Sequence, residues 1–251
     1  MEEQKDISLN KFISETGYCS RREADKLIEA GRVSVNGKLP KSGNRVSYND
    51  VIKVDGKLLK SKDKPVYIAF HKPVGISSTT DVKDKYNIIS YLNYPKRIFP
   101  IGRLDKPSEG LIFLTNDGDI VNKILRAGNN HEKEYIVTVN KPVTQDFIKR
   151  MSEGIEILGT ITQKCFVKQE SKNVFKIVLT QGLNRQIRRM CESLQYQVTR
   201  LVRVRIMNIT LSGIETGRWR YLSQLEIEKI NTLVADSIKT KEGSLINANK
   251  K

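Results

Sequence analysis

Val66-Tyr67-Ile68-Ala69-Phe70 is the first of several apolar, β-branched and aromatic runs that decide the fold class of this 251-residue chain. Such runs are typical of strands. They are interspersed with segments of helical periodicity at residues 119–127, 144–153 and 184–195, and some follow one another directly. This mixture predicts an α+β domain with a mostly antiparallel central sheet flanked by helices. The other strand-like runs are residues 111–114, 135–139 and 174–179.

About sixty residues upstream of this domain form a pattern of their own. Ser20 and Glu23 fit a capping box, which supplies partners for the free amides at a helix start. Asn36-Gly37 and Asp55-Gly56 are strong hairpin-turn signals. We therefore expect two short helices and a small curled sheet.

The expected domain boundaries follow from these changes of pattern. Residues 1–60 form the small N-terminal domain, and lysine-rich residues 58–64 supply a linker. Residues 65–234 form the larger domain. Residues 235–251 are polar, basic and without period, which predicts a disordered tail.

The charge balance indicates a polyanionic partner. Lys and Arg number 44 against 28 Asp and Glu, a formal net charge of +16. Such an excess speeds encounter with polyanions, and phosphate contacts dominate nucleic-acid affinity. A membrane is not expected, since no run approaches the ~18 apolar residues of a spanning helix. The polar start at residues 1–6 does not resemble a secretory signal. Cys19, Cys165 and Cys191 are odd in number and far apart, which favours a reducing, cytoplasmic location.

Asp105 is the most economical candidate for a reactive group. It lies in Gly102-Arg103-Leu104-Asp105-Lys106, just after a strand-like run that contains a proline. One interpretation is a turn aspartate that bonds to nearby amides. The other is a nucleophile or base beside Arg103, whose cation would hold the carboxylate ionised.

The helix predicted at residues 184–195 is rich in arginine. Ile187 and Met190 lie on its apolar face, Arg185 and Arg189 point away from that face, and Arg188 lies at the border between the two. A solvated helix face is one interpretation. The six arginines and single acid of residues 181–205 favour nucleic acid instead, with Arg203 and Arg205 among the expected RNA contacts.

Two smaller features remain open between a structural and an RNA-binding role. Tyr135 begins a strand, where tyrosine commonly packs, although RNA sites also stack bases on such rings. Arg21, Arg22 and Lys26 share one predicted helix, either as a solvated face or as an RNA contact. No His or Cys stands at metal-ligand spacing, so no metal site is expected.

Three separated segments together resemble one family. Residues 101–105 (IGRLD), continued by residues 108–118 (SEGLIFLTNDG), resemble the catalytic motif of RsuA-type ribosomal RNA pseudouridine synthases. Residues 133–135 (KEY) and 182–190 (GLNRQIRRM) resemble two further motifs of that family, in the same order. Upstream, residues 20–24 (SRREA) and 31–37 (GRVSVNG) resemble the alpha-L RNA-binding module of the ribosomal protein S-four type.

The resemblance implies a role for each motif residue. Asp105 is implied to be catalytic, either attacking the target uridine or removing a sugar proton while the glycosidic bond breaks. Tyr135 is implied to stack on the target base, Arg188 to pair with and orient Asp105, and Arg103 to help flip the uridine. The reaction is redox-neutral and implies no cofactor and no metal. Lys106-Pro107-Ser108 departs from the family, which often has threonine there.

The resemblance also implies the partner. Residues 125–128 and 180–184 favour the subtype that acts on large-subunit ribosomal RNA, with a transfer RNA as a second substrate left open, and we expect a monomer. Two rival hypotheses about function remain open. A non-catalytic RNA-binding factor would not need Asp105, and an RNA hydrolase would release uracil or cleaved strands.

Overall fold

The computed structural model describes residues 7–41, 43–59, 64–125 and 131–235. The predicted tail from residue 236 onward, most of the predicted linker (60–63) and part of the subtype signal (126–128) lie outside them. The chain divides into two compact units. The first comprises the described residues up to Val66 together with Tyr94–Ile98 and Asn116–Gly118, and the second comprises the rest.

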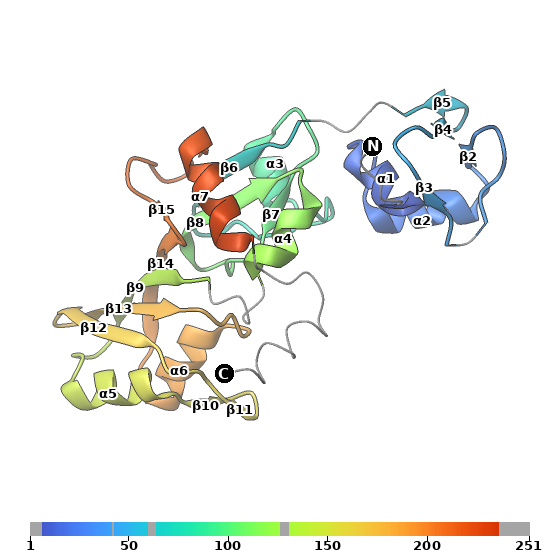
Figure 1. Ribbon diagram of the computed structural model, residues 1–251. Helices are drawn as coiled ribbons and strands as arrows, with labels where there is room; N and C mark the ends of the chain where they lie inside the picture. The colour runs from blue at the N-terminus through green and yellow to red at the C-terminus, as the bar shows by residue number, and fades with distance from the viewer. Residues whose placement is uncertain (1–6, 42, 60–63, 126–130, 236–251) are drawn as a thin grey trace. The chain divides into compact units, whose positions relative to one another are not determined.

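The first unit contains the two short helices that the sequence predicts, and its strands form two small sheets, β1-β3 and β2-β4-β5, where one was expected (Figure 1). Ser20 and Glu23 form both hydrogen bonds of the capping box at the start of the second helix. Asn36 and Asp55 adopt the left-handed conformation that their hairpin turns require, each followed by a glycine of positive φ. Its elements are β1 (Ile7–Ser8), α1 (Leu9–Glu15), α2 (Arg21–Glu29), β2 (Val33–Val35), β3 (Arg45–Val46), β4 (Ile52–Val54) and β5 (Lys57–Leu58).

The second unit is an α+β domain, as predicted from the sequence. Its helices are α3 (Ile88–Leu92), α4 (Gly118–Leu125), α5 (Gln145–Glu153), α6 (Gln186–Ser193) and α7 (Gln224–Val234). Its main strands are β6 (Tyr67–Lys72), β7 (Phe99–Ile101), β8 (Glu109–Thr115), β9 (Lys133–Val139), β12 (Phe166–Ser171), β13 (Val174–Leu179), β14 (Val198–Ile206) and β16 (Trp219–Tyr221). Short strands β10 (Glu156–Ile157), β11 (Thr160–Ile161) and β15 (Ile209–Thr210) complete it.

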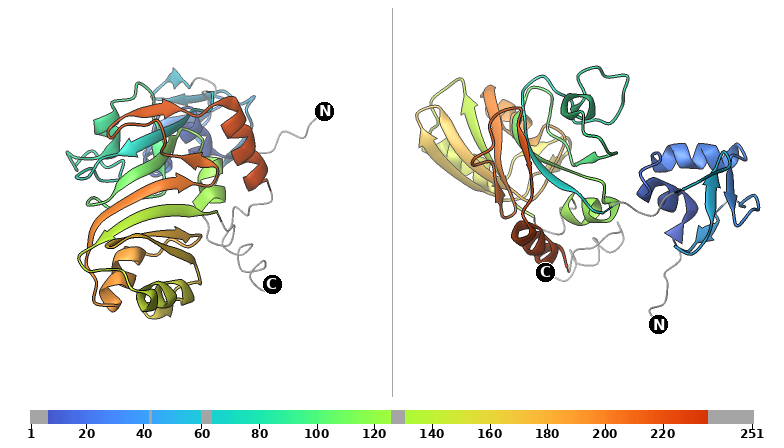
Figure 2. Two further views of the ribbon diagram at one scale, coloured as in Figure 1. Left: turned by 90° about the vertical axis from the view of Figure 1, so that its left-hand side faces the viewer. Right: turned by 90° about the horizontal axis from the view of Figure 1, so that it is seen from above.

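One large sheet organises the second unit (Figure 2). The strand order is β12-β13-β9-β14-β8-β6-β16, with β15 paired to β14 and β7 paired to β8. Every pairing is antiparallel except that of β14 with β8. That parallel pairing is short, because only Val202 with Glu109 and Arg203 with Gly110 lie opposite one another.

The short β14–β8 pairing divides the sheet into two halves, each with its own apolar core. On one side Phe147 and Met151 of α5, together with Met190 of α6, pack against β9 and β13. On the other side Ile120 of α4 and Ile230 of α7 pack against β8. A junction joined by few backbone bonds leaves room for a cavity between the two packed halves.

Gly110 allows the two halves to meet. Its φ is +114°, and a Cβ at this position would lie 2.3 Å from the carbonyl oxygen of Arg203. A side chain here would push β14 away from β8, so glycine is required for the parallel pairing.

Candidate active site

The loop that carries Asp105 joins β7 to β8, and hydrogen bonds tether its backbone on both sides of that residue. The Ser78 hydroxyl accepts from the Leu104 amide at 3.1 Å and donates to the Leu104 carbonyl at 2.9 Å. The Gly75 amide donates to the Lys106 carbonyl at 2.8 Å. The loop therefore presents a half-buried carboxylate from a fixed backbone, as a reactive group requires.

Arg188 of α6 holds the residues that follow Asp105. Its Nη2 donates to the Pro107 carbonyl at 3.1 Å and to the Ser108 hydroxyl at 3.2 Å, while Nη1 donates to the Val198 carbonyl at 3.1 Å. The sequence analysis places Arg188 at the border between the apolar and polar faces of the helix. Its side chain is buried in the structure, with the residue 8% exposed.

The implied ion pair between Arg188 and Asp105 is not formed: within the described residues, neither side chain donates to or accepts from the other. The two groups interact at longer range. Burial lowers the pKa of Arg188, Arg185 lowers it further, and Asp105 raises it. Arg188 is thus connected to Asp105 through hydrogen bonds to the following loop residues and through a longer-range electrostatic interaction.

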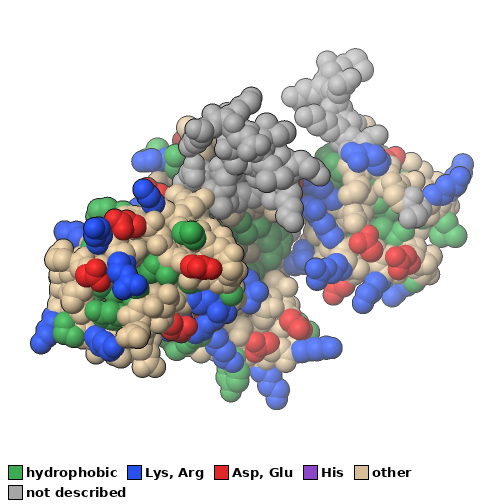
Figure 3. All heavy atoms as spheres, turned by 90° about the horizontal axis from the view of Figure 1, so that it is seen from below, with side chains coloured by type: hydrophobic (Ala, Val, Ile, Leu, Met, Phe, Trp, Pro, Cys, Tyr) green, Lys and Arg blue, Asp and Glu red, His purple; other side chains and the backbone are tan. Residues whose placement is uncertain are grey.

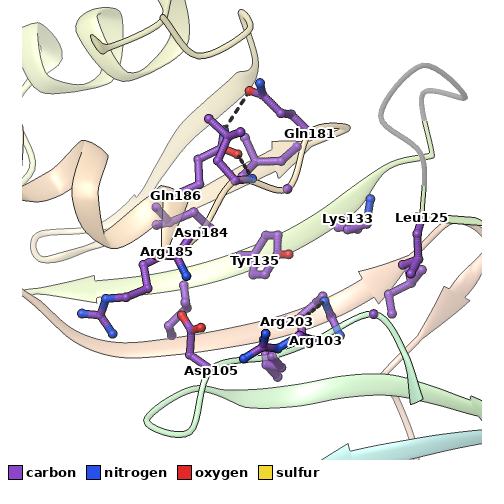
Figure 4. A pocket seen from close by; sticks show the side chains of 18 of the residues that line it. Arg103, Asp105, Leu125, Lys133, Tyr135, Gln181, Asn184, Arg185, Gln186 and Arg203 are labelled. Carbon is purple, nitrogen blue, oxygen red and sulfur yellow. Dashed lines mark hydrogen bonds between the residues drawn. The ribbon is translucent and has the colours of Figure 1, made fainter. Parts of the chain in front are cut away.

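Asp105 and Tyr135 line a single cavity of about 490 Å³ at the junction of the two sheet halves. Figure 4 shows Asp105 entering from the β7–β8 loop and Tyr135 lying across from it on β9. The size is that of a small-molecule site and admits a base extruded from its stack. Apolar side chains supply much of the wall: Ile101, Phe113, Leu179, Ile187, Leu201 and Ile206.

Two exposed arginines, Arg103 and Arg185, line the same cavity. Arg103 lies two residues before Asp105, and Arg185 is the left-handed residue (φ 50°) that precedes α6. That conformation explains why α6 begins at Gln186 instead of residue 184. Within the described part of the chain, neither guanidinium has a hydrogen bond or ion pair, so both remain available to phosphate.

Two buried cations, Lys133 and Arg203, line this cavity, and a third, Lys72, lies close enough to Asp105 to interact with it electrostatically. The sequence pattern assigned no role to Lys72 or Lys133. Lys72, Lys133 and Arg203 are 0%, 8% and 4% exposed. Lys72 donates to the carbonyls of Pro73 and Ile76, both at 2.8 Å. Burial and the nearby Arg203 lower the pKa of Lys72 to about 8, against an opposing effect of Asp105. The surroundings of Asp105 are therefore strongly positive.

Arg203 and Arg205 were expected to contact RNA, and the structure gives them different surroundings. Nε of the buried Arg203 donates to the Leu111 carbonyl at 2.6 Å. Arg205 forms ion pairs with Glu132 at 2.9 Å and Glu134 at 3.0 Å. Two carboxylates therefore already pair with Arg205, and the expected RNA contacts of Arg203 and Arg205 stay predictions.

The other predicted RNA contacts are accessible. Arg21, Arg22 and Lys26 are exposed on α2, and Lys and Arg side chains are spread over the face shown in Figure 3. Arg189 is half-buried, and its guanidinium donates to the backbone carbonyl and the side-chain oxygen of Asn184, at 3.1 and 3.3 Å. Arg189 therefore stabilises the loop before α6, and part of its side chain remains exposed to solvent.

Other kinds of site are not found among the described residues. They contain no group of three or more His, Cys, Asp or Glu side chains placed to hold a metal ion. No helix among them is long and apolar enough to cross a membrane.

Comparison with known proteins gives consistent matches. Residues 66–193 match the family model described as RNA pseudouridylate synthase, and residues 8–52 match the S4 domain. The "Dual-specificity RNA pseudouridine synthase RluF" of Salmonella typhi is 58% identical over 91% of this chain and 80% of its own. The "Ribosomal large subunit pseudouridine synthase B" of Bacillus subtilis (strain 168) is 33% identical over 90% of this chain and 96% of its own.

A solved structure agrees with both. The "Crystal structure of pseudouridylate synthase" superimposes with a TM-score of 0.65 and 30% identity, and covers 89% of this chain and 99% of its own. Both the fold class and the presence of an N-terminal RNA-binding domain before the larger domain agree with these matches.

Proposed function

The chain belongs to the RNA pseudouridylate synthase family, and from that premise we propose that it isomerises a uridine of large-subunit ribosomal RNA through Asp105. The bond between C1′ of the ribose and N1 of the uracil breaks, and a bond between C1′ and C5 forms. The hydrogen on C5 leaves as a proton and N1 gains one, so the RNA keeps its mass and releases nothing.

The observation that carries this proposal is the pair formed by Asp105 and Tyr135 across one cavity. A stacked base cannot present its glycosidic carbon to a half-buried carboxylate, so the uridine must leave the helix. Tyr135 offers a ring on which the extruded base stacks. Arg103, at the exposed edge of the cavity, contacts the RNA from which the base is flipped.

Asp105 acts on the bound nucleotide by one of two routes, attack on the uridine or removal of a sugar proton. Both routes need an ionised carboxylate. Lys72 and Arg188 each bring positive charge close enough to interact electrostatically with Asp105.

The choice of substrate is supported by the names of the relatives. The Bacillus subtilis relative is named for the large ribosomal subunit, and the Salmonella typhi relative is named for dual specificity. We therefore propose large-subunit ribosomal RNA as the main substrate and a transfer RNA as the second.

RNA binding is divided between the two units. We assign Arg21, Arg22 and Lys26 of α2 to recruitment of the RNA, and Arg185 and Arg189 to phosphates beside the cavity. Residues 1–60 then form the recruiting domain, residues 65–234 the catalytic domain and residues 235–251 a basic tail. We place the protein in the cytoplasm as a monomer.

Mapping of pseudouridine in ribosomal and transfer RNA, from cells with and without this protein, tests the proposal. We expect one large-subunit position and one transfer-RNA position to lose the modification when the protein is absent. Unchanged maps of both RNAs would contradict the substrate assignment.

A further inference from the structure

Lys133 is a buried cation of the cavity wall that the mechanism above does not use. Its Nζ donates to the carbonyl oxygens of His131 at 3.0 Å and Thr180 at 3.4 Å. Both partners are neutral, and Nζ forms no salt bridge with any described carboxylate. An ammonium group has three donors, so one remains beyond these two bonds. Lys133 therefore brings to the cavity wall a fixed positive charge that no carboxylate pairs with directly.

The strand geometry aligns Lys133 with Tyr135. The two residues are two positions apart on β9, and side chains at that spacing lie on one face of a strand. In Figure 4, Tyr135 lies between Asp105 and Lys133. A base stacked on Tyr135 therefore has one edge toward Asp105 and the opposite edge toward Lys133.

The structure of uracil determines which edge of the ring faces Asp105 and which edge faces Lys133. N1, which carries the sugar, must face Asp105, where the glycosidic bond reacts. The carbonyl oxygen O4 is on the opposite side of the ring from N1 and consequently faces Lys133. When the bond between C1′ and N1 breaks, its electron pair leaves with the base, and the negative charge spreads over N1, O2 and O4.

We propose that Lys133 is a catalytic residue that contacts the O4 edge of the flipped uracil and stabilises the negative charge formed when the glycosidic bond breaks. This inference rests on the proposed function, since it needs a uridine bound over Tyr135. It holds for both routes open to Asp105, because each expels the base with the same electron pair. Lys133 keeps its proton throughout, so no proton balance changes.

The surroundings of Lys133 suit this role. Burial, and to a lesser extent Arg203, lowers its pKa to about 8, so most of the group is charged at neutral pH but is poorly solvated. A cation that is already dehydrated and held in place needs no reorganisation when charge develops on the substrate. Its charge then acts most strongly in the transition state.

The test compares two RNA substrates that differ only at the target base, uridine and 5-fluorouridine. Fluorine withdraws electrons, which stabilises the expelled base and reduces the need for Lys133. It blocks only the last step, loss of the C5 hydrogen. Consumption of the target nucleoside in single turnover, followed by nuclease digestion and mass spectrometry, reports the earlier steps for both substrates.

For Lys133→Met we expect the single-turnover rate on uridine to fall by about 10²–10³, as for loss of one oxyanion donor. On 5-fluorouridine the loss should be at least tenfold smaller (roughly one decade of that range), with RNA affinity unchanged. Lys133→Arg should retain most activity. Lys168→Met, an exposed lysine of β12, is the matched control and should not change either rate.

Three results would overturn the inference. Equal losses on both substrates would indicate a structural role, weaker RNA binding with an unchanged rate would indicate a phosphate contact, and unchanged kinetics would indicate no role. If Lys133→Met does not fold, as judged by its melting curve, Lys133→Gln serves instead because it keeps a donor without the charge. Any RNA that the unaltered protein modifies serves as substrate, so an error in the ribosomal assignment does not affect this comparison.

Discussion

Arg188 Nη2 and the carbonyl oxygen of Pro107 lie 3.1 Å apart, although 81 positions separate the two residues in the sequence. This hydrogen bond connects α6 to the loop that carries Asp105. The guanidinium fork also reaches Ser108 and Val198, so its geometry matters as much as its charge.

The first prediction separates these two contributions of Arg188. Arg188→Lys keeps the charge but cannot reproduce the planar fork. We expect it to lower the single-turnover rate by about 10², since a displacement of a reactive group by ~1 Å costs that much. RNA affinity, measured by filter binding, should change little. Full activity in Arg188→Lys would show that charge alone is required.

A second prediction concerns Gly110. Gly110→Ala places a Cβ against the Arg203 backbone at a positive φ. We expect the free energy of unfolding, measured by urea denaturation, to fall by more than ~2 kcal/mol. The added Cβ fits only if β14 and β8 move apart, and that movement breaks their parallel pairing. Gly182→Ala is the control, since nothing lies within 4 Å of the added Cβ, and it should stay within ~0.5 kcal/mol.

A third prediction concerns the basic side chains of α2. Replacing Arg21, Arg22 and Lys26 by Ala should weaken RNA binding, and the plot of log affinity against log salt should become less steep by about 0.7–0.9 for each phosphate that the variant no longer neutralises. Arg32→Ala is the control, because Asp55 already pairs with that guanidinium. An unchanged salt slope in the triple variant would contradict the recruiting role of α2.

The pH dependence of stability supplies a fourth prediction. The pKa of Lys133 is about 8 in the folded protein and about 10.4 in an unfolded chain. Between these values the unfolded state binds more protons, so the contribution of Lys133 to stability rises with pH. Below about pH 8 both states are protonated, and the cost of burying the charge is fully present.

Urea denaturation of the unaltered protein and of Lys133→Met isolates this effect. The difference in unfolding free energy should shift in favour of the unaltered protein from pH 8 to pH 10 and stay constant from pH 6 to pH 7. A difference that is flat over the whole range would contradict the burial of a charged Lys133.

Local features of the fold could be read from the sequence because their physics is local. Ser20 with Glu23 forms the capping box that its spacing predicts, and Ser223 with Glu226 forms a second one at the start of α7. Ile187 and Met190 are buried on the predicted face of α6. Each of these depends on residues three or four positions apart.

The parts of the site that sequence reasoning missed depend on distant segments. Arg205 meets Glu132 and Glu134 across more than seventy positions, which no local pattern indicates. Arg203 lies on β14 where its backbone passes close to Gly110 of β8, a contact between segments ninety-three positions apart. Lys133 belongs to a recognised motif, but its role in the cavity wall follows from the sheet pairing.

The measurement that tests the central claim most directly is single-turnover pseudouridine formation by Asp105→Asn on an RNA that the unaltered protein modifies. Asparagine has nearly the shape of aspartate but cannot act as a nucleophile or base. We predict no detectable pseudouridine, with RNA affinity and melting temperature unchanged. Pseudouridine formed by Asp105→Asn at a rate near that of the unaltered protein would contradict the assignment of Asp105 as the reactive group.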